Sequence, residues 1–271
     1  MPVPHHGIDQ LAERKSKVGP IIGIVLFVLV GGGLLLYLNR AGTEAAMDKA
    51  FQSPDVATYS SKAGQRAPNL KLEDSTTINL GADTKLIVPP GYGQRWRAVQ
   101  LDGTVELTPP PNASPPLDIR APHGIAVTSS GGTVGVHAFS TDNWVAVRVK
   151  GGTAEVKTPS ASRSVEDGQA VMVDSGGAVR DATPAEVSDA FSWVDGNLTI
   201  TQQPLGEAIK RIRRWYGMEL NVKDKALLTR PVTLSATIAE SKGMIDSLQS
   251  AAKVKFGYDG GRMILTDASG R

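Results

Sequence analysis

An uncharged apolar run occupies residues 18–38, with the sequence VGPIIGIVLFVLVGGGLLLYL. Because an α-helix rises about 1.5 Å per residue, a helix over this run would cross the roughly 30 Å of hydrocarbon in a bilayer. The run is longer than the apolar core of a typical signal peptide, and no A-x-A cleavage pattern follows it directly. We therefore expect a transmembrane helix over 18–38 rather than a cleaved signal.

Basic residues are crowded before this run. Arg14, Lys15 and Lys17 precede it, whereas the basic residues beyond its other end are mixed with acidic ones. Since positively charged flanks stay in the cytoplasm, residues 1–17 are expected to form a short cytoplasmic tail. The remainder of the chain is then exported, which predicts a single-pass inner-membrane protein whose C-terminal region lies in the periplasm.

The composition allows a folded exported region and excludes several kinds of site. Hydrophobic residues make up 41% of the chain and charged residues 21%, which is enough for a packed core. The formal net charge of +2 lacks the strongly basic balance of nucleic-acid-binding domains, so we expect no nucleic-acid partner. Cysteine is absent, which removes disulfides, thiol catalysis and cysteine-based metal sites.

The part after the apolar run begins with a polar segment and continues with strand patterns. Residues 39–71 are rich in small polar side chains and predict a juxtamembrane linker with at most one short helix around Thr43–Phe51. Residues 72–182 contain short alternating runs separated by turn residues, which predicts an all-β sandwich or β-roll. Asp102-Gly103 between two such runs is a strong hairpin signal. The predicted strands are 76–80, 85–88, 97–101, 104–107, 117–121, 124–128, 133–139, 144–150, 154–158, 170–173 and 178–180.

The pattern changes near Thr183, where threonine, proline and, three positions on, glutamate form the signature of a capped helix start. We expect a connecting helix within 183–196. Residues 197–271 then follow a strand–helix–strand order twice, with the helices beginning near Pro204 and Ser241. This order predicts a small βαβ-βαβ module with both helices on one face of a sheet. The predicted fold class is therefore mainly β, with an α+β module at the end of the chain.

Several motifs occur in an order that is typical of one family. In chain order they are Arg97-Ala98-Val99-Gln100-Leu101-Asp102-Gly103, Gly132-Thr133-Val134-Gly135-Val136, Val147-Arg148-Val149-Lys150-Gly151-Gly152, Val165-Glu166-Asp167-Gly168-Gln169-Ala170, Trp193-Val194-Asp195-Gly196-Asn197-Leu198, Pro204-Leu205 and Arg214-Trp215-Tyr216-Gly217. Together they resemble the FecR family, the membrane-anchored regulators of extracytoplasmic-function sigma factors, over about Glu73–Val222. Small residues replace the aromatic residue that the family has in the second motif.

The resemblance implies a function. Residues 198–266 also resemble the short N-terminal module of secretins and TonB-dependent receptors, which docks onto similar modules of outer-membrane receptors. The implied protein transmits an envelope or outer-membrane receptor signal toward a cytoplasmic sigma factor, through a shift or proteolysis of the membrane helix. The family usually has a folded cytoplasmic anti-sigma region of several dozen residues, whereas only 1–17 precede the apolar run here. This difference leaves a second interpretation, an envelope structural or assembly protein without sigma-factor control.

Catalytic and metal-binding signatures do not stand out in the sequence. No G-x-S-x-G, H-E-x-x-H or phosphate-binding G-x-x-x-x-G-K motif occurs. His5 and His6 lie in the tail, and His123 and His137 stand alone in strand patterns, so we expect neither a metal site nor another cofactor. An enzyme such as a wall hydrolase is therefore disfavoured.

A basic helical face is the main candidate for partner binding. Its residues are Lys210, Arg211, Arg213 and Arg214, followed by Trp215. Such a face is solvated, a docking patch for an acidic partner or, as a weaker alternative, a contact with an anionic membrane surface, and the sequence leaves these open.

Aromatic residues and one strand at the C-terminal module have further predicted roles. Trp193, Trp215 and Tyr216 are predicted to pack the module against the β region, with a partner surface as the alternative. The strand at Val232–Ile238 is a candidate for strand addition by a peptide or receptor segment.

Overall fold

The computed structural model describes residues 42–268. The predicted transmembrane helix and cytoplasmic tail lie outside these residues. Within 42–268, no helix is long and apolar enough to cross a membrane. Residues 42–51 are helical, as the sequence predicted for the segment after the apolar run.

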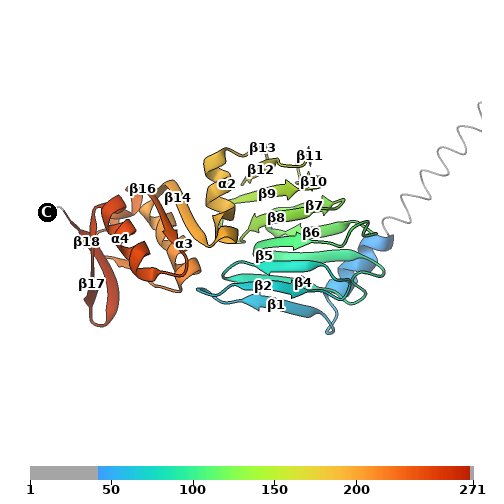
Figure 1. The fold of residues 1–271 in the computed structure, drawn as a ribbon, viewed down its shortest axis with the longest axis horizontal. Coiled ribbons are helices and arrows are strands. Elements are labelled where there is room, and N and C mark those ends of the chain that lie inside the picture. The colour runs from blue at the N-terminus through green and yellow to red at the C-terminus, as the bar shows by residue number, and fades with distance from the viewer. Residues whose placement is uncertain (1–41, 269–271) are drawn as a thin grey trace, which may run out of the picture. The chain divides into compact units, whose positions relative to one another are not determined.

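The β region contains thirteen strands that are hydrogen-bonded into one continuous sheet (Figure 1). The bounds are β1 Ala57–Ser61, β2 Ala67–Lys71, β3 Thr77–Leu80, β4 Thr84–Val88, β5 Arg97–Thr108, β6 Leu117–Ala121, β7 Ile125–Ser129, β8 Thr133–Ala138, β9 Trp144–Lys150, β10 Ala154–Lys157, β11 Ser162–Val165, β12 Ala170–Asp174 and β13 Val179–Asp181. The main path runs β11-β10-β7-β6-β5-β8-β9-β12-β13, and β1 to β4 attach to it through β5. A mainly β architecture is confirmed.

Strand β5 joins two groups of strands. Its first half pairs with β4 and β6, and its second half pairs with β3 and β8. The predicted hairpin at Asp102-Gly103 is wrong, because the strand continues through both residues. Gly103 has a φ of +141°, and a Cβ there would lie 2.4 Å from Thr84 Oγ1. Glycine therefore serves the close packing of β4 against β5, and it does not form a turn.

A main hydrophobic core fills the β region. Side chains from both strand groups contribute fully buried residues to it, among them Leu86, Ile119, Ile78 and Val147. Alternation of buried and exposed positions along β3 and β4 follows from the period of two in a strand. The prediction of a linker up to residue 71 is wrong, because β1 and β2 belong to the sheet.

The sequence pattern does not predict β1 and β2, and for β1 the reason is its place at an edge of the sheet. β1 pairs only with β4, and its side chains are mostly exposed, with the burial pattern of an edge strand. Main-chain hydrogen bonds hold such a strand, so it needs no apolar face. Ser61 adds a side-chain bond, because the backbone N–H of Thr84 donates to its Oγ over 3.1 Å.

Helix α2, Pro184–Phe191, follows the β region and begins with the predicted cap. Thr183 Oγ1 accepts from the Glu186 N–H over 3.3 Å, and the Glu186 carboxylate accepts from the Thr183 N–H over 2.9 Å. At its other end, Phe191 is buried against β8, where a Cβ on Gly135 would lie 3.1 Å from Phe191 Cε1. Phe191 thus packs where Gly135 presents no side chain. A short 3-10 helix, η2 Ser192–Asp195, ends the segment.

The C-terminal module has the predicted element order. It consists of β14 Asn197–Pro204, α3 Leu205–Tyr216, β15 Asn221–Val222, the 3-10 helix η3 Lys225–Thr229, β16 Pro231–Thr237, α4 Ser241–Ala252, β17 Val254–Asp259 and β18 Arg262–Asp267. Its strands form two small sheets, β14-β16 and β15-β18-β17, and not the single sheet that was predicted. Both helices contribute to a core shared with these sheets, through Leu205, Ile212, Met244 and Leu248.

Candidate functional site

Two arginines of α3 extend from the C-terminal module into the β region. Arg211 and Arg214 are three positions apart, so they lie on the same side of the helix. Each residue is only 5% exposed. Because buried charges need partners, these two residues identify the contact between the module and the β region as a candidate functional site.

Arg214 makes a bidentate ion pair with Asp142, in the loop between β8 and β9. Nη1 and Nη2 lie 3.1 Å from the two carboxylate oxygens, and Nη2 is 3.3 Å from Thr141 Oγ1. The guanidinium also lies over the ring of Phe139, 3.3 Å from its centroid. Paired donors in a fixed fork make this contact strongly directional.

His137, on β8, lies behind this ion pair. Its Nε2 is 3.3 Å from Asp142 Oδ2, and its ring stacks on Trp144 with the centroids 4.3 Å apart. Burial lowers the pKa of His137 to about 4, against the opposing effect of Asp142. The ring is therefore neutral at physiological pH. Since an ionised carboxylate only accepts hydrogen bonds, the proton of the neutral ring is placed on Nε2.

Burial would raise the pKa of Asp142, but hydrogen bonds from His137 and Arg214 outweigh it. They hold the pKa of this carboxyl well below its usual value. Asp142 is consequently ionised across the physiological pH range. Its carboxylate accepts hydrogen bonds from the neutral imidazole of His137 and from the guanidinium of Arg214.

Arg211 pairs with Asp189, on α2. Its Nη1 lies 3.6 Å from Asp189 Oδ2, and its Nη2 donates to the Asp189 carbonyl oxygen. Burial raises the pKa of Asp189, while Arg211 and hydrogen bonds from Thr201 and Gln203 oppose the increase. Nε and Nη1 of Arg211 are buried without a hydrogen-bond acceptor among the described residues. The hydrogen-bond donors of Arg211 are therefore less completely paired than those of Arg214.

We call His137, Asp142, Asp189, Arg211 and Arg214 the ionic junction. A cavity of about 490 Å³ borders it between the β8–β9 loop and the start of α3. The cavity is lined by Thr141, Asp142, Asn143, Trp144, Gln203, Pro204, Glu207, Lys210 and Arg211. Within residues 42–268, no group of three or more His, Cys, Asp or Glu side chains has the arrangement of a metal site.

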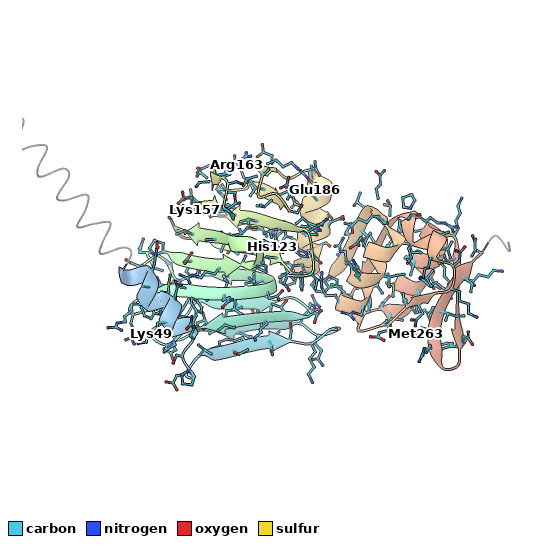
Figure 2. All side chains as sticks on the ribbon, turned by 180° about the vertical axis from the view of Figure 1, so that it is seen from behind. Lys49, His123, Lys157, Arg163, Glu186 and Met263 are labelled. Atoms are coloured by element: carbon cyan, nitrogen blue, oxygen red, sulfur yellow. The ribbon has the colours of Figure 1, made fainter. Side chains whose placement is uncertain are left out.

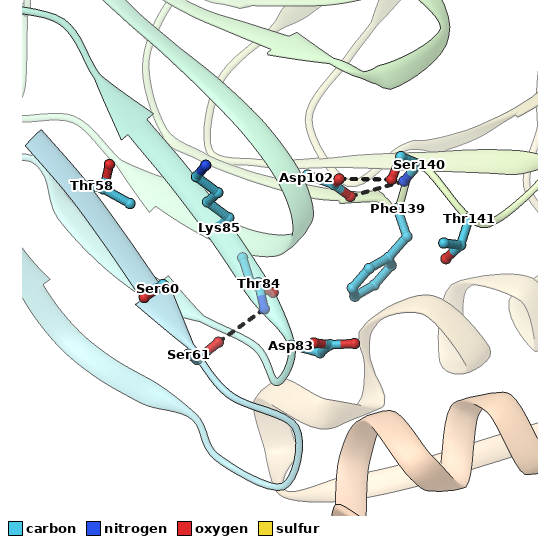
Figure 3. A pocket seen from close by; sticks show the side chains of 10 residues that line it. All are labelled: Thr58, Ser60, Ser61, Asp83, Thr84, Lys85, Asp102, Phe139, Ser140 and Thr141. Atoms are coloured by element: carbon cyan, nitrogen blue, oxygen red, sulfur yellow. Dashed lines mark hydrogen bonds between the residues drawn. The ribbon is translucent and has the colours of Figure 1, made fainter. Parts of the chain in front are cut away.

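The loop that carries Asp142 is fixed onto β5. Asp102 accepts from the Ser140 N–H over 2.9 Å and from the Ser140 hydroxyl over 2.7 Å, as Figure 3 shows. These residues border a second hollow of about 380 Å³, into which Phe139 points. The position of Asp142 therefore depends on the strand that joins the two strand groups.

A second set of contacts holds the end of α3. The loop between β1 and β2 reaches it, and the Gly64 N–H donates to the Arg214 carbonyl oxygen over 2.9 Å. Arg66 Nη1 donates to the Trp193 carbonyl oxygen over 2.9 Å. Trp215 stacks on Trp193, with centroids 5.8 Å apart, and a Cβ on Gly81 would lie 3.0 Å from its ring. The two tryptophans therefore pack at the contact between the module and the β region, as predicted. Tyr216, predicted to do the same, donates its hydroxyl to the Thr237 carbonyl oxygen within the module over 3.0 Å.

The structure buries part of the predicted basic face and leaves the rest exposed. Arg211, Arg214 and Trp215 are buried, so they are not part of an exposed docking patch in this conformation. Lys210 and Arg213 are exposed, and Lys210 pairs with Glu207 over 2.8 Å. Helical spacing placed the residues correctly on α3. It could not indicate which side of the helix faces Asp142 and Asp189.

Two crystal structures share this fold. They belong to a "putative anti-sigma factor" from Parabacteroides distasonis ATCC 8503, determined at 2.50 and 1.65 Å. Each superposes with a TM-score of 0.68 over 78% of this chain and 99% of the other, at 19% and 18% identity. No family model matches the sequence, and no curated protein matches it. The similarity is thus one of fold.

Proposed function

We propose that the chain is a FecR-like regulator, anchored by one helix in the inner membrane with its N-terminus in the cytoplasm. It transmits a signal from the envelope, or from an outer-membrane receptor, toward a cytoplasmic sigma factor. It does so through protein contacts and without catalysis. The observation that carries the proposal is the fold shared over 78% of the chain with a protein described as a "putative anti-sigma factor".

The ionic junction suggests how the signal would pass between the exported parts. A partner that binds the C-terminal module acts on α3, whose buried arginines are paired with Asp142 and Asp189. Removing one side chain of a buried ion pair costs about 3–5 kcal/mol, because a charge is left uncompensated. A movement of α3 would separate both ion pairs, so binding at the module is coupled to the β8–β9 loop and to α2.

The loop between β1 and β2 extends this contact toward the start of the chain. It bonds to the end of α3, while β1 begins only a few residues after the helix at 42–51. A change at the module can in this way reach the segment that leads to the predicted membrane helix.

The direct test is capture of the sigma factor from membranes. The full-length chain is solubilised in mild detergent and isolated from its native host, and co-purifying proteins are identified. A sigma factor should be recovered, and deletion of residues 1–17 should abolish its recovery while the exported part still folds. A matched variant replaces only residues 1–13 by a neutral sequence of equal length and keeps Arg14, Lys15 and Lys17, which set the expected orientation, and it should also lose the sigma factor.

Unchanged target-gene expression after deletion of 1–17, together with failed envelope assembly on loss of the exported part, would favour the assembly function instead. Hydrolysis of envelope polymers by the purified chain would contradict the non-catalytic role. Recovery of the chain from the cytosol without lipid would contradict the anchor.

A further inference from the structure

Strand β17 is an unpaired edge of its sheet. The order β15-β18-β17 leaves one side of β17 without a neighbouring strand among the described residues. With β18 it forms a hairpin whose turn is Gly260-Gly261, and Figure 2 labels Met263 on it. Free edges are usually short or charged because they can pair with another chain.

The backbone of β17 has a defined outward set of hydrogen-bonding groups. The Ala268 N–H donates to the Lys253 carbonyl oxygen over 3.0 Å, which makes 253 and 268 a hydrogen-bonded pair in register with the hairpin. Hydrogen-bonded pairs alternate along an antiparallel ladder. The N–H and C=O groups of Phe256 and Tyr258 consequently point away from β18.

The side chains on this edge are unusual for an exposed strand. Tyr258 is 70% exposed, and within residues 42–268 it is the one large hydrophobic residue with this degree of exposure. Phe256 lies on the same face, with its ring centroid 5.4 Å from that of Tyr258. Lys255 and Asp259 lie on the opposite face, and both are exposed.

The sequence of β17 is complementary to itself. If two copies run antiparallel about Gly257, Phe256 of one copy lies opposite Tyr258 of the other. Lys255 then lies opposite Asp259. Aromatic pairs and opposite charges are the cross-strand pairs that stabilise antiparallel strands. Glycine within a strand often marks a place where another backbone approaches closely, and a Cβ at Gly257 has only Ile264 Cγ1 within 4.0 Å.

We propose that β17 binds β17 of a second copy of this chain, antiparallel and centred on Gly257. The pairing joins two three-stranded sheets about a twofold axis, and each Phe256–Tyr258 pair exchanges its outward main-chain hydrogen bonds. Two existing contacts have to change, because the Phe256 N–H now donates to Gln249 Oε1 over 2.9 Å and Asp259 now pairs with Lys223 over 2.8 Å. A main-chain acceptor of the second copy can replace the part-buried glutamine oxygen, and the exposed Lys223–Asp259 pair contributes little net stability.

The absence of cysteine makes the register directly testable. Gly257→Cys places the single thiol on the twofold axis. In a non-hydrogen-bonded pair the two Cα atoms lie about 4.5 Å apart, within disulfide range. Lys255→Cys is the matched control on the same face of the same strand. Its two copies are four residues apart along the pair, about 13 Å, which is beyond that range.

The full-length chain is purified in detergent and mildly oxidised. Gly257→Cys should give at least about tenfold more disulfide dimer than Lys255→Cys, because only its thiols meet. A mixture of Lys255→Cys with Asp259→Cys should also cross-link. Adding Tyr258→Lys to Gly257→Cys should reduce the dimer to the control level. Equal cross-linking at 255 and 257, no cross-linking at 257, or insensitivity to Tyr258→Lys would each overturn the proposal, whatever the outcome for the sigma factor.

Discussion

Lowering the pH should destabilise the chain through His137. The ring is enclosed by Trp144, Phe139 and Asp142, and burial lowers its pKa to about 4 from an ordinary value of 6.5. The unfolded chain therefore binds a proton at a higher pH than the folded chain does. Stability is fully present above pH 6.5 and is lost as the pH falls toward 4.

The size of the effect follows from the two pKa values. Between pH 7.5 and pH 5, protonation of His137 stabilises the unfolded state but hardly the folded state. The free energy of unfolding therefore falls by about 2 kcal/mol for this one residue. Asp142 contributes only at lower pH, because its pKa is held below its usual value. Asp189 has the opposite sign, since its raised pKa favours the folded state as the pH falls.

The measurement is urea-induced unfolding, followed by tryptophan fluorescence at pH 7.5 and pH 5. The chain should lose about 2 kcal/mol more between these conditions than a His137→Gln variant, which cannot be protonated. Comparing the two chains cancels the contributions of Asp189 and of histidines elsewhere. An NMR titration that places the pKa of His137 near 6.5, or equal losses in both chains, would refute the reasoning.

Three further predictions concern an ion pair, a packing contact and a helix cap. Arg214→Met or Asp142→Asn alone should lower the free energy of unfolding in urea by about 3–5 kcal/mol, and the double variant should lower it by clearly less than the sum of the two. Strict additivity would mean that the two residues are not coupled. Gly81→Ala should lower the unfolding free energy by about 1–3 kcal/mol and shift the fluorescence of Trp215, because the new Cβ would clash with a threonine methyl group and lie 3.0 Å from the indole. Unchanged stability and unchanged emission would contradict this packing. Thr183→Ala should lower the unfolding free energy by about 1 kcal/mol, whereas Thr183→Ser should restore it, and equal losses in both would remove the cap as the cause.

Local patterns in the sequence predicted most of the described elements. The alternating runs gave β3, β4, β6 to β10, β12 and β13 within a few residues, and the signature at Thr183 gave the capped start of α2. These features depend on neighbours that are close in the chain. The continuity of β5 through Asp102-Gly103 was missed, because the dipeptide has the same local signal in a turn and in a packed strand.

The ionic junction could not be predicted in the same way. Asp142 and Arg214 are 72 positions apart, and no periodicity connects a loop residue of the β region with a helix of the module. His137 stood alone in its strand pattern, although its burial and its contact with Asp142 make it part of the site. The basic cluster on α3 indicated the correct helix, but only the fold shows that two of its arginines are buried.

The reach of the β1–β2 loop onto α3 has a mechanical consequence. Tension applied at the start of the described residues would load the contact of Phe51 with Arg120 on β6 and then β1, which is held by a single neighbouring strand. Detaching it would also withdraw Gly64 from the last turn of α3, which carries Arg214. A pull at the start of these residues would thus free the last turn of α3 from one of its hydrogen bonds once β1 has detached, which links mechanical load on β1 to the helix that carries both buried arginines.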